Sequence, residues 1–162
     1  MESLGTNGTV ASLHLHSEVP NELMKEVKSI SVVVGKGIKD NPRYYDAKTK
    51  KGLPNKRHMS LIEREQIEEH ALFLSEPLKS GVVRSNIETS GINLSSLLGK
   101  KVAIGDNAVV LFTMLRDPCY KMDMICHGLK RLMADGRQGV ICEILVSGTI
   151  NVGDKIRAVP DN

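Results

Sequence analysis

Short apolar segments separated by glycine-containing turns constrain the fold more than any other feature of this sequence. The segments are rich in β-branched residues, and alternate side chains along a strand line one face of a sheet. Ile30, Val32 and Val34 should share a face in this way. Strands are predicted at residues 10–15, 27–34, 81–87, 101–104, 108–115, 140–146, 149–152 and 155–159. Many short strands favour a small β-barrel, closed or nearly closed.

Helical signals are fewer. Ser60-Leu61-Ile62-Glu63 matches a capping box, which predicts a helix from there to about Leu74. Its buried stripe would contain Ile67, Ala71 and Leu74. Helical spacing also predicts a helix over 122–133 and a single turn over 94–98. We therefore expect a mainly β fold with a few short helices.

The chain length of 162 residues suits one domain. We expect residues 1–8 to be a flexible lead-in and residues 9–160 to form a single barrel domain. Aromatic residues make up 3% of the chain, so the core must be built from Val, Ile, Leu and Met. No apolar run is long enough to span a membrane, and the first residues lack signal-peptide features. We therefore expect a cytoplasmic protein without a membrane partner.

The net charge of +3 is too small to indicate nucleic-acid binding, and few aromatic residues are present for base stacking. A mild basic excess is equally compatible with a phosphate-bearing small molecule. The cysteines Cys119, Cys126 and Cys142 cannot all pair, so in a reducing compartment they should be thiols. Cys126 and Cys142 lie in apolar patterns and are expected to pack in the core. His14 and His16 lie two residues apart, but no third metal ligand accompanies them.

Cys119 is the candidate reactive residue. It follows Pro118, which forces a turn after the predicted strand 108–115. Arg116 and Lys121 lie close in sequence, and nearby cations favour the thiolate form of a cysteine, whereas Asp117 opposes them. The alternative is a buried, inert thiol, because free cysteines are among the most buried residues.

Candidate anion-binding residues lie in three segments. Arg84 and Asn86 are two apart on a predicted strand, so both should point to one side. An arginine beside a carboxamide suits an oxyanion, although a solvated sheet face has the same pattern. Lys36 lies in a Gly-Lys-Gly turn, whose amides can approach an anion. Arg57 and His58 precede the predicted capped helix, where anions are attracted. The alternative interpretations are an ordinary turn for the Gly-Lys-Gly segment and a surface histidine without a role for His58.

An ordered set of motifs resembles the MOSC domain, the module named after the C-terminal part of molybdenum cofactor sulfurases. Its pieces, in order along the chain, are Gly8-Thr9-Val10, Val32–Asp40, Arg57–Ile62, Arg84-Ser85-Asn86-Ile87, Gly91-Ile92, Leu97-Leu98-Gly99, Ile104-Gly105, Pro118-Cys119 and Gly148–Asp154. One departure is Lys39, which stands where the family often has the second glycine of Gly-x-x-Gly-Asp. The aminotransferase-like domain of the sulfurases is not visible, so we expect no pyridoxal phosphate site.

The resemblance implies a β-barrel that binds the molybdenum cofactor, a pterin with a terminal phosphate. The family's invariant cysteine maps to Cys119, which would ligate molybdenum or accept sulfur. Lys36, Arg57, His58, Arg84 and Asn86 would contact the cofactor. By resemblance, an enzymatic role would be reduction of N-hydroxylated compounds. The alternative is a non-catalytic sulfur carrier in cofactor maturation, whose partners would be a sulfur donor and other maturation proteins. A third hypothesis is an interaction module with an inert Cys119.

Overall fold

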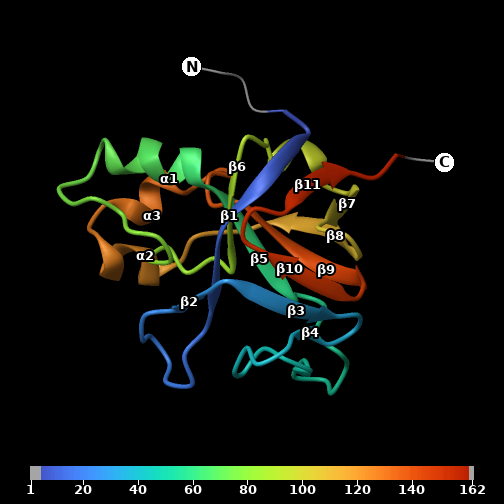
Figure 1. The fold of residues 1–162 in the computed structure, drawn as a ribbon. Coiled ribbons are helices and arrows are strands. Elements are labelled where there is room, and N and C mark those ends of the chain that lie inside the picture. Colours follow the sequence, from blue (N-terminus) through green and yellow to red (C-terminus); the bar gives the residue numbers. More distant parts are fainter. Residues whose placement is uncertain (1–4, 161–162) are drawn as a thin grey trace.

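A twisted β-barrel flanked by three short α-helices makes up the part of the chain that the structure, a computed structural model, describes, residues 5–160 (Figure 1). The strands are β1 Asn7–Leu15, β2 Lys25–Val27, β3 Ser29–Val33, β4 Gly37–Ile38, β5 Met59–Glu63, β6 Ile87–Ser90, β7 Lys101–Ile104, β8 Ala108–Leu115, β9 Val140–Val146, β10 Gly148–Asn151 and β11 Lys155–Ala158. The helices are α1 Arg64–Ala71, α2 Tyr120–Ile125 and α3 Leu129–Leu132, with a 3-10 turn at Ser95–Leu97.

Pairing between the first and last strands closes the barrel. The 8-stranded sheet has the order β11-β7-β8-β9-β5-β6-β1-β2, and β1 also pairs with β11. In that pairing Gly8 lies opposite Ile156. Closure matters because an open sheet edge exposes unpaired backbone groups. The remaining strands form a 3-stranded sheet, β10-β3-β4, beside the barrel. The mainly β, barrel-type fold predicted from the sequence is confirmed.

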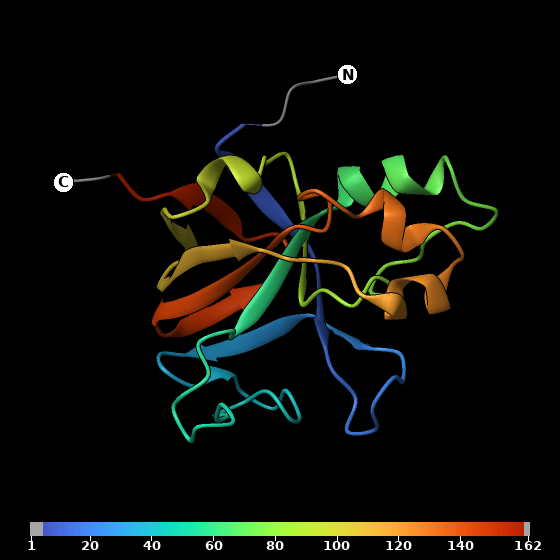
Figure 2. The same cartoon turned by 180° about the vertical axis from the view of Figure 1, so that it is seen from behind.

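Apolar strand faces form the barrel core. Alternate residues of the strands are fully buried, among them Leu61, Val110 and Ile144. Phe112 is the one aromatic side chain among the largest fully buried residues, which agrees with a core made from aliphatic residues. A second apolar cluster joins the helices to the barrel and contains Ile62, Ile67, Val83, Met122, Leu129 and Met133. The helices lie together on one side of the barrel in both views (Figures 1 and 2).

Three strands match their predicted bounds, namely 101–104, 108–115 and 140–146. The single turn predicted over 94–98 is also present, at Ser95–Leu97. The domain was expected to begin at residue 9, but β1 begins at Asn7. Residues 1–4 of the expected lead-in lie outside the described residues. No helix in the described range is both long and apolar enough to cross a membrane.

The capping-box prediction is wrong. Ser60 lies within β5, and the helix begins at Arg64, without a side-chain cap. β5 pairs with β9, and Ser60 bonds to Asn86 instead of to a helical amide. Tertiary pairing therefore overrides the local pattern. The helix also ends at Ala71, before the predicted Leu74.

Three further predictions need correction. Residues 81–86 form turns, and the strand begins only at Ile87. The helix predicted over 122–133 is broken into α2 and α3 by Gly128, whose φ of 93° is left-handed. Val34 lies outside β3 and is 51% exposed, whereas Ile30 and Val32 are buried as predicted.

Candidate functional site

A pocket of about 230 Å³ opens where several segments distant in sequence meet. It lies between the end of β1, the loop 39–58, the start of β5, the turns before β6, the end of β8 and the start of β9. The lining residues are His16, Asn41, Tyr44, Asn55, Arg57, His58, Met59, Ser60, Arg84, Asn86, Arg116 and Ile141. Four of the predicted anion contacts, Arg57, His58, Arg84 and Asn86, are therefore brought together here.

Three arginines give the pocket its charge. Arg57 and Arg84 both act on Arg116 and lower its pKa. Desolvation is the largest cause of that shift, and the pKa of Arg116 falls to about 10. Arg116 therefore remains a cation at pH 7, held near two other cations in a partly buried place. Such crowding disfavours an empty pocket and favours an oxyanion that accepts from several guanidinium groups.

Asn86 serves the framework as well as the pocket. Its Oδ1 accepts from the backbone N–H of Ser60 at 3.1 Å and lies 3.3 Å from the Ser60 hydroxyl. Its Nδ2 donates to the carbonyl of His14 at 3.1 Å. The carboxamide thus joins β1, β5 and the segment that enters β6. Its main role in the described structure is to hold these strands, and one Nδ2 proton is left for a ligand.

Arg84 has a strained backbone conformation. Its φ is 65°, which lies in the left-handed region that non-glycine residues seldom adopt. Its Nη1 donates to the carbonyl of Glu22 at 2.8 Å, in the loop that follows β1. Such strain persists where the surroundings enforce it and is concentrated at functional sites. The turn therefore presents this guanidinium to the pocket although no strand carries it.

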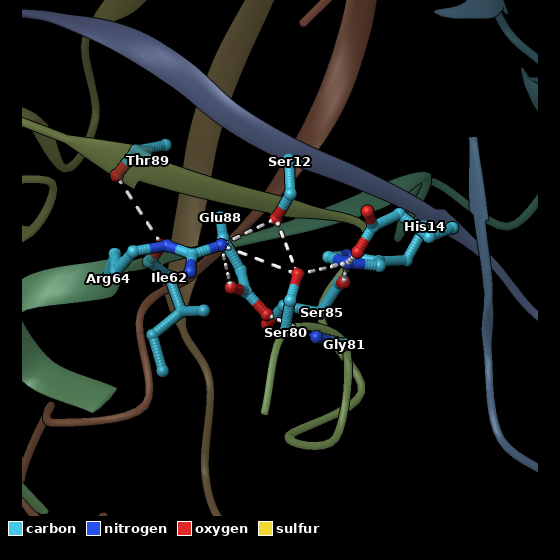
Figure 3. Close-up of polar contacts among 10 residues, drawn as sticks. Ser12, His14, Ile62, Arg64, Ser80, Gly81, Ser85, Glu88 and Thr89 are labelled. Atoms are coloured by element: carbon cyan, nitrogen blue, oxygen red, sulfur yellow. Dashed lines mark hydrogen bonds and ion pairs between the residues drawn. The ribbon is translucent and has the colours of Figure 1, made fainter. Parts of the chain in front are cut away.

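A buried polar cluster supports the turn that bears Arg84 (Figure 3). Glu88 forms an ion pair with Arg64 at 2.6 Å and accepts from the backbone N–H of Gly81 at 2.6 Å. Nδ1 of His14 lies 3.2 Å from the carbonyl oxygen of Ser85. The hydroxyl of Ser85 in turn accepts from Nη1 of Arg116 at 3.0 Å, at the edge of the pocket. Two arginines of the pocket therefore depend on one turn.

His58 is buried and has an unsatisfied nitrogen. The backbone N–H of Ile144 donates to its Nδ1 at 2.9 Å. Its Nε2 is buried and has no hydrogen-bond partner among the described residues. Desolvation is the largest influence on the ring and lowers the pKa of His58. The neutral ring then carries its proton on Nε2, a buried donor in a residue that lines the pocket.

His16, Asn41 and Tyr44 also line the pocket. Oδ1 of Asn41 accepts from the backbone N–H of His16 at 2.8 Å and lies 3.2 Å from Nδ1 of the same residue. The rings of His16 and Tyr44 have centroids 4.3 Å apart. Burial, reinforced by Arg84, Arg43 and Arg116, lowers the pKa of His16 to about 4 despite the Asn41 bond. The imidazole is therefore neutral at pH 7.

Cys119 is exposed and stands directly before α2. It is not among the residues that line the pocket, but it lies near enough to Arg116 for its thiolate form to raise the pKa of that guanidinium against desolvation. The thiol therefore lies within electrostatic reach of the pocket. Cys126 and Cys142 are buried, as expected, and burial raises the pKa of Cys142. The part of the chain that is described holds no group of three or more His, Cys, Asp or Glu residues suited to a metal ion.

Lys36 does not join this site. It is exposed on the turn between β3 and β4 and does not line the pocket. Its backbone carbonyl accepts from the N–H of Asp46 at 2.8 Å, which fastens the loop 39–58 to the turn. The Gly-Lys-Gly motif therefore acts here as a turn beside the pocket.

The sequence was compared with known protein families, and one family matches the region that contains these strands and residues. The pattern that defines the MOSC domain matches residues 48–157, which include β5 to β10, most of β11, Cys119 and all three pocket arginines. The chain belongs to the MOSC domain family. The MOSC match makes it a molybdenum-cofactor-related domain in the general sense of its family.

Solved structures share this MOSC fold. The YuaD protein from Bacillus subtilis has a TM-score of 0.76 at 21% identity, covering 93% of this chain and 94% of that one. YiiM from Escherichia coli has a TM-score of 0.65 at 15% identity, covering 99% of this chain and 72% of its own. YiiM from Geobacillus stearothermophilus has a TM-score of 0.66 at 16% identity, covering 98% and 76%. At these identities the likeness concerns the fold. No curated protein matches the sequence.

Within the MOSC domain, sequence reasoning missed part of the pocket. Arg116 was noted only as a neighbour of Cys119, and His16 only as half of an incomplete histidine pair. Asn41 and Tyr44 lie in a loop whose polar composition gave no signal for these two positions. The weak signal available was position, because Arg116 directly follows β8 and His16 directly follows β1.

Proposed function

We propose that this chain binds the molybdenum cofactor, with the cofactor's phosphate in the arginine pocket and its metal beside Cys119. The observation that carries the proposal is the place of Arg116. This guanidinium lines the pocket together with Arg57 and Arg84, and Cys119 lies near enough for its thiolate form to interact with it. One bound molecule with an anionic end and a thiophilic metal would engage both features.

The residues present fit such a cofactor by their chemistry. Guanidinium groups bind phosphate oxygens through paired hydrogen bonds, and three of them meet here. The unpartnered Nε2 of His58 offers a further donor. A thiolate is a soft ligand suited to a thiophilic metal, and Cys119 is the exposed cysteine. Lys36, which lies on the neighbouring turn, is left out of the proposed contacts.

Each group would have a separate task. Arg57, Arg84, Arg116 and His58 would bind the phosphate and orient the cofactor, while Asn86 would keep the strands around it in place. Cys119 would ligate the metal or receive sulfur. When bound, the cofactor would supply two-electron redox chemistry, and reduction of N-hydroxylated compounds is the reaction proposed for it. The exposure of Cys119 leaves that side open to a substrate.

The proposal is tested by purifying the chain from cells supplied with molybdate and measuring molybdenum and pterin per chain. We expect about one of each in the parent chain. The double variant Arg84→Gln, Arg116→Gln should lose most of the pterin, because the phosphate contacts are removed. Arg157→Gln changes an exposed arginine on β11 and serves as the control. A parent chain that contains neither molybdenum nor pterin would contradict the proposal.

A second candidate function is a sulfur carrier in cofactor maturation. The observation that favours it is the exposure of Cys119 at the surface, where a sulfur-donor protein can reach it. This function predicts a persulfide on Cys119, a mass increase of one sulfur atom that reductant removes, and no turnover of N-hydroxylated substrates. Intact-mass measurement before and after reduction distinguishes the two functions.

A further inference from the structure

Backbone amides fix where the proton of His16 lies. An amide N–H can only donate, so Oδ1 of Asn41, which accepts from the N–H of His16 at 2.8 Å, must be an oxygen with no proton to give. The ring Nδ1 of His16 lies 3.2 Å from the same oxygen and must therefore carry a proton. A neutral imidazole has one donor and one acceptor nitrogen. Nε2 of His16 is thus an acceptor, and no described residue bonds to it.

His58 has the opposite arrangement. The backbone N–H of Ile144 donates to its Nδ1 at 2.9 Å, so that nitrogen is the acceptor. The proton of the neutral ring then lies on Nε2, which is buried without a partner among the described residues. The two histidines of the pocket therefore require opposite hydrogen-bonding groups on a ligand. His58 needs an oxygen that accepts, and His16 needs a group that donates.

The neutral state of His16 follows from its surroundings. A ring with a pKa of about 4 is protonated in about one molecule in a thousand at pH 7. The charged and titratable groups around it are Arg43 and Tyr44 in the loop 39–58, Arg84 before β6, Arg116 after β8, and Arg57 and His58 in the same pocket. The arginines among them disfavour a proton on Nε2.

We propose that the pocket binds a phosphate monoester in its singly protonated form and rejects sulfate esters, with Nε2 of His16 as the selecting atom. This inference rests on the pocket being the anion site of the proposed function. The arginines and His58 donate to the phosphate oxygens, while the ester's remaining O–H donates to His16. A sulfate ester has only acceptor oxygens, so it would turn a lone pair toward that of Nε2.

Binding of the ester in this form should be coupled to proton uptake. A phosphate monoester has a second pKa of about 6, so at pH 7 most of it is a dianion in solution. Binding of the singly protonated form then removes up to one proton per ligand from the solvent. No bond is made or broken in the ester, and His16 itself is not charged in the complex.

Phenyl phosphate and phenyl sulfate test the inference by calorimetry at pH 5.5. At that pH about three quarters of phenyl phosphate is singly charged, as phenyl sulfate is, so most of the difference in charge is removed, and His16 is still largely neutral. We expect phenyl phosphate to bind at least about tenfold more tightly than phenyl sulfate. In His16→Gln the ratio should fall to within about twofold, because a carboxamide can turn to donate or accept. His127→Gln, which changes an exposed histidine outside the pocket, should keep the parent ratio.

Equal affinities in the parent chain, no binding of either ester, or an unchanged ratio in His16→Gln would overturn the inference. A nitrogen-15 NMR spectrum of the free chain gives a second readout, in which Nδ1 of His16 should be protonated and Nε2 bare. A protonated Nε2 would also overturn it. Proton uptake with phenyl phosphate at pH 7.5, measured in buffers of different ionisation enthalpy, is expected in the parent chain.

These measurements separate the inference from the proposed function. Phenyl esters contain neither molybdenum nor pterin, so discrimination by His16 in a chain that purifies without cofactor would retain the inference and count against the cofactor proposal. A chain that holds the cofactor but binds both esters equally would support the cofactor proposal and overturn the inference about His16.

Discussion

Arg116 joins the two parts of the site at the scale of single residues. It lines the pocket, donates to the hydroxyl of Ser85 and lies near enough to Cys119 to interact with the thiolate form of that residue. Its backbone is fixed as well, because its N–H donates to the carbonyl of Gly139 at 3.0 Å. Because both the backbone and the guanidinium group of Arg116 are hydrogen-bonded, the side chain is preorganised for an anion and loses little conformational freedom on binding.

The three cysteines should differ sharply in reactivity. Cys119 is exposed, whereas Cys126 and Cys142 are buried, and burial raises the pKa of Cys142. Thiolates react and buried thiols do not. Brief treatment of the native chain with iodoacetamide should therefore label Cys119 alone, and denatured chain should be labelled at all three positions. Peptide mass mapping checks this. Native labelling at Cys142 in preference to Cys119 would contradict the structure.

Glu63 should make stability depend on pH. It is 3% exposed, and burial raises its pKa from 4.5 to about 7. The folded chain then binds a proton that the unfolded chain releases between these values, so the contribution of Glu63 to stability is fully present below pH 4.5 and is lost as pH rises through 7. Glu63→Gln keeps an acceptor for the backbone N–H of Leu94 without the charge.

We expect Glu63→Gln to be more stable than the parent chain by roughly 2–3 kcal/mol at pH 8. The two chains should have nearly equal stability at pH 4. Urea denaturation at both pH values measures the difference. Glu68→Gln, on the exposed face of α1, is the control and should change little at either pH. If the parent chain is as stable as the variant at pH 8, ionisation of Glu63 does not destabilise the folded chain.

At the scale of strands and turns, the close packing of β9 against β5 fixes the position of Arg116. Gly139 precedes β9 with a φ of 81°, and a Cβ there would collide with the carbonyl oxygen of Leu61 in β5. The absence of a side chain lets β9 lie against β5, and it brings the Gly139 carbonyl to the N–H of Arg116. One glycine therefore serves both the barrel and the pocket.

Gly139→Ala should cost more than about 3 kcal/mol of unfolding free energy, because backbone atoms of β5 must move in addition to the conformational strain. Gly153→Ala is the matched control. Its φ of 91° is also left-handed, but a Cβ there meets nothing within 4 Å. Strain alone predicts a loss of about 1–2 kcal/mol for the control. Equal losses in thermal or urea unfolding would show that the collision is relieved without cost.

Local pattern predicted the elements whose neighbours in sequence are also their neighbours in space. The hairpin of β7 and β8 is one, with the predicted turn between its strands. Ser60 shows where such reasoning fails, since its pairing partners in β9 lie about eighty residues away. Arg84 and Asn86 were predicted as neighbours and do share the pocket, but in a turn held by Glu88 and not on a strand. The meeting of His16, Asn41 and Arg116 depends on how the whole sheet curls, which no local pattern encodes.

Closure of the barrel by its first and last strands is the main feature of the whole molecule. Ile156 in β11 is fully buried and lies opposite Gly8 in β1 and Ile104 in β7. Pocket residues lie in or directly beside β1, β5, β8 and β9, which belong to one contiguous run of the sheet, so the pocket forms where that sheet curls. Folding and site formation should therefore be one cooperative event.

Ile156→Asp should abolish this cooperative folding, with a loss of more than about 4 kcal/mol, because a carboxylate would be buried without a partner. Arg157→Asp introduces the same side chain on the exposed face of the same strand and should retain a single transition. Circular dichroism on heating measures both. A folded Ile156→Asp chain that still binds phenyl phosphate would show that the pocket does not require closure.

Cofactor binding by this chain requires that Cys119 and the arginine pocket hold the same molecule. Its most direct test is the molybdenum content of Cys119→Ser purified from molybdate-fed cells beside the parent chain, with equal yields of folded protein. We predict about one molybdenum per parent chain and a loss of most of it in the variant. A variant that keeps the full molybdenum content of the parent chain would contradict the role given to this thiol.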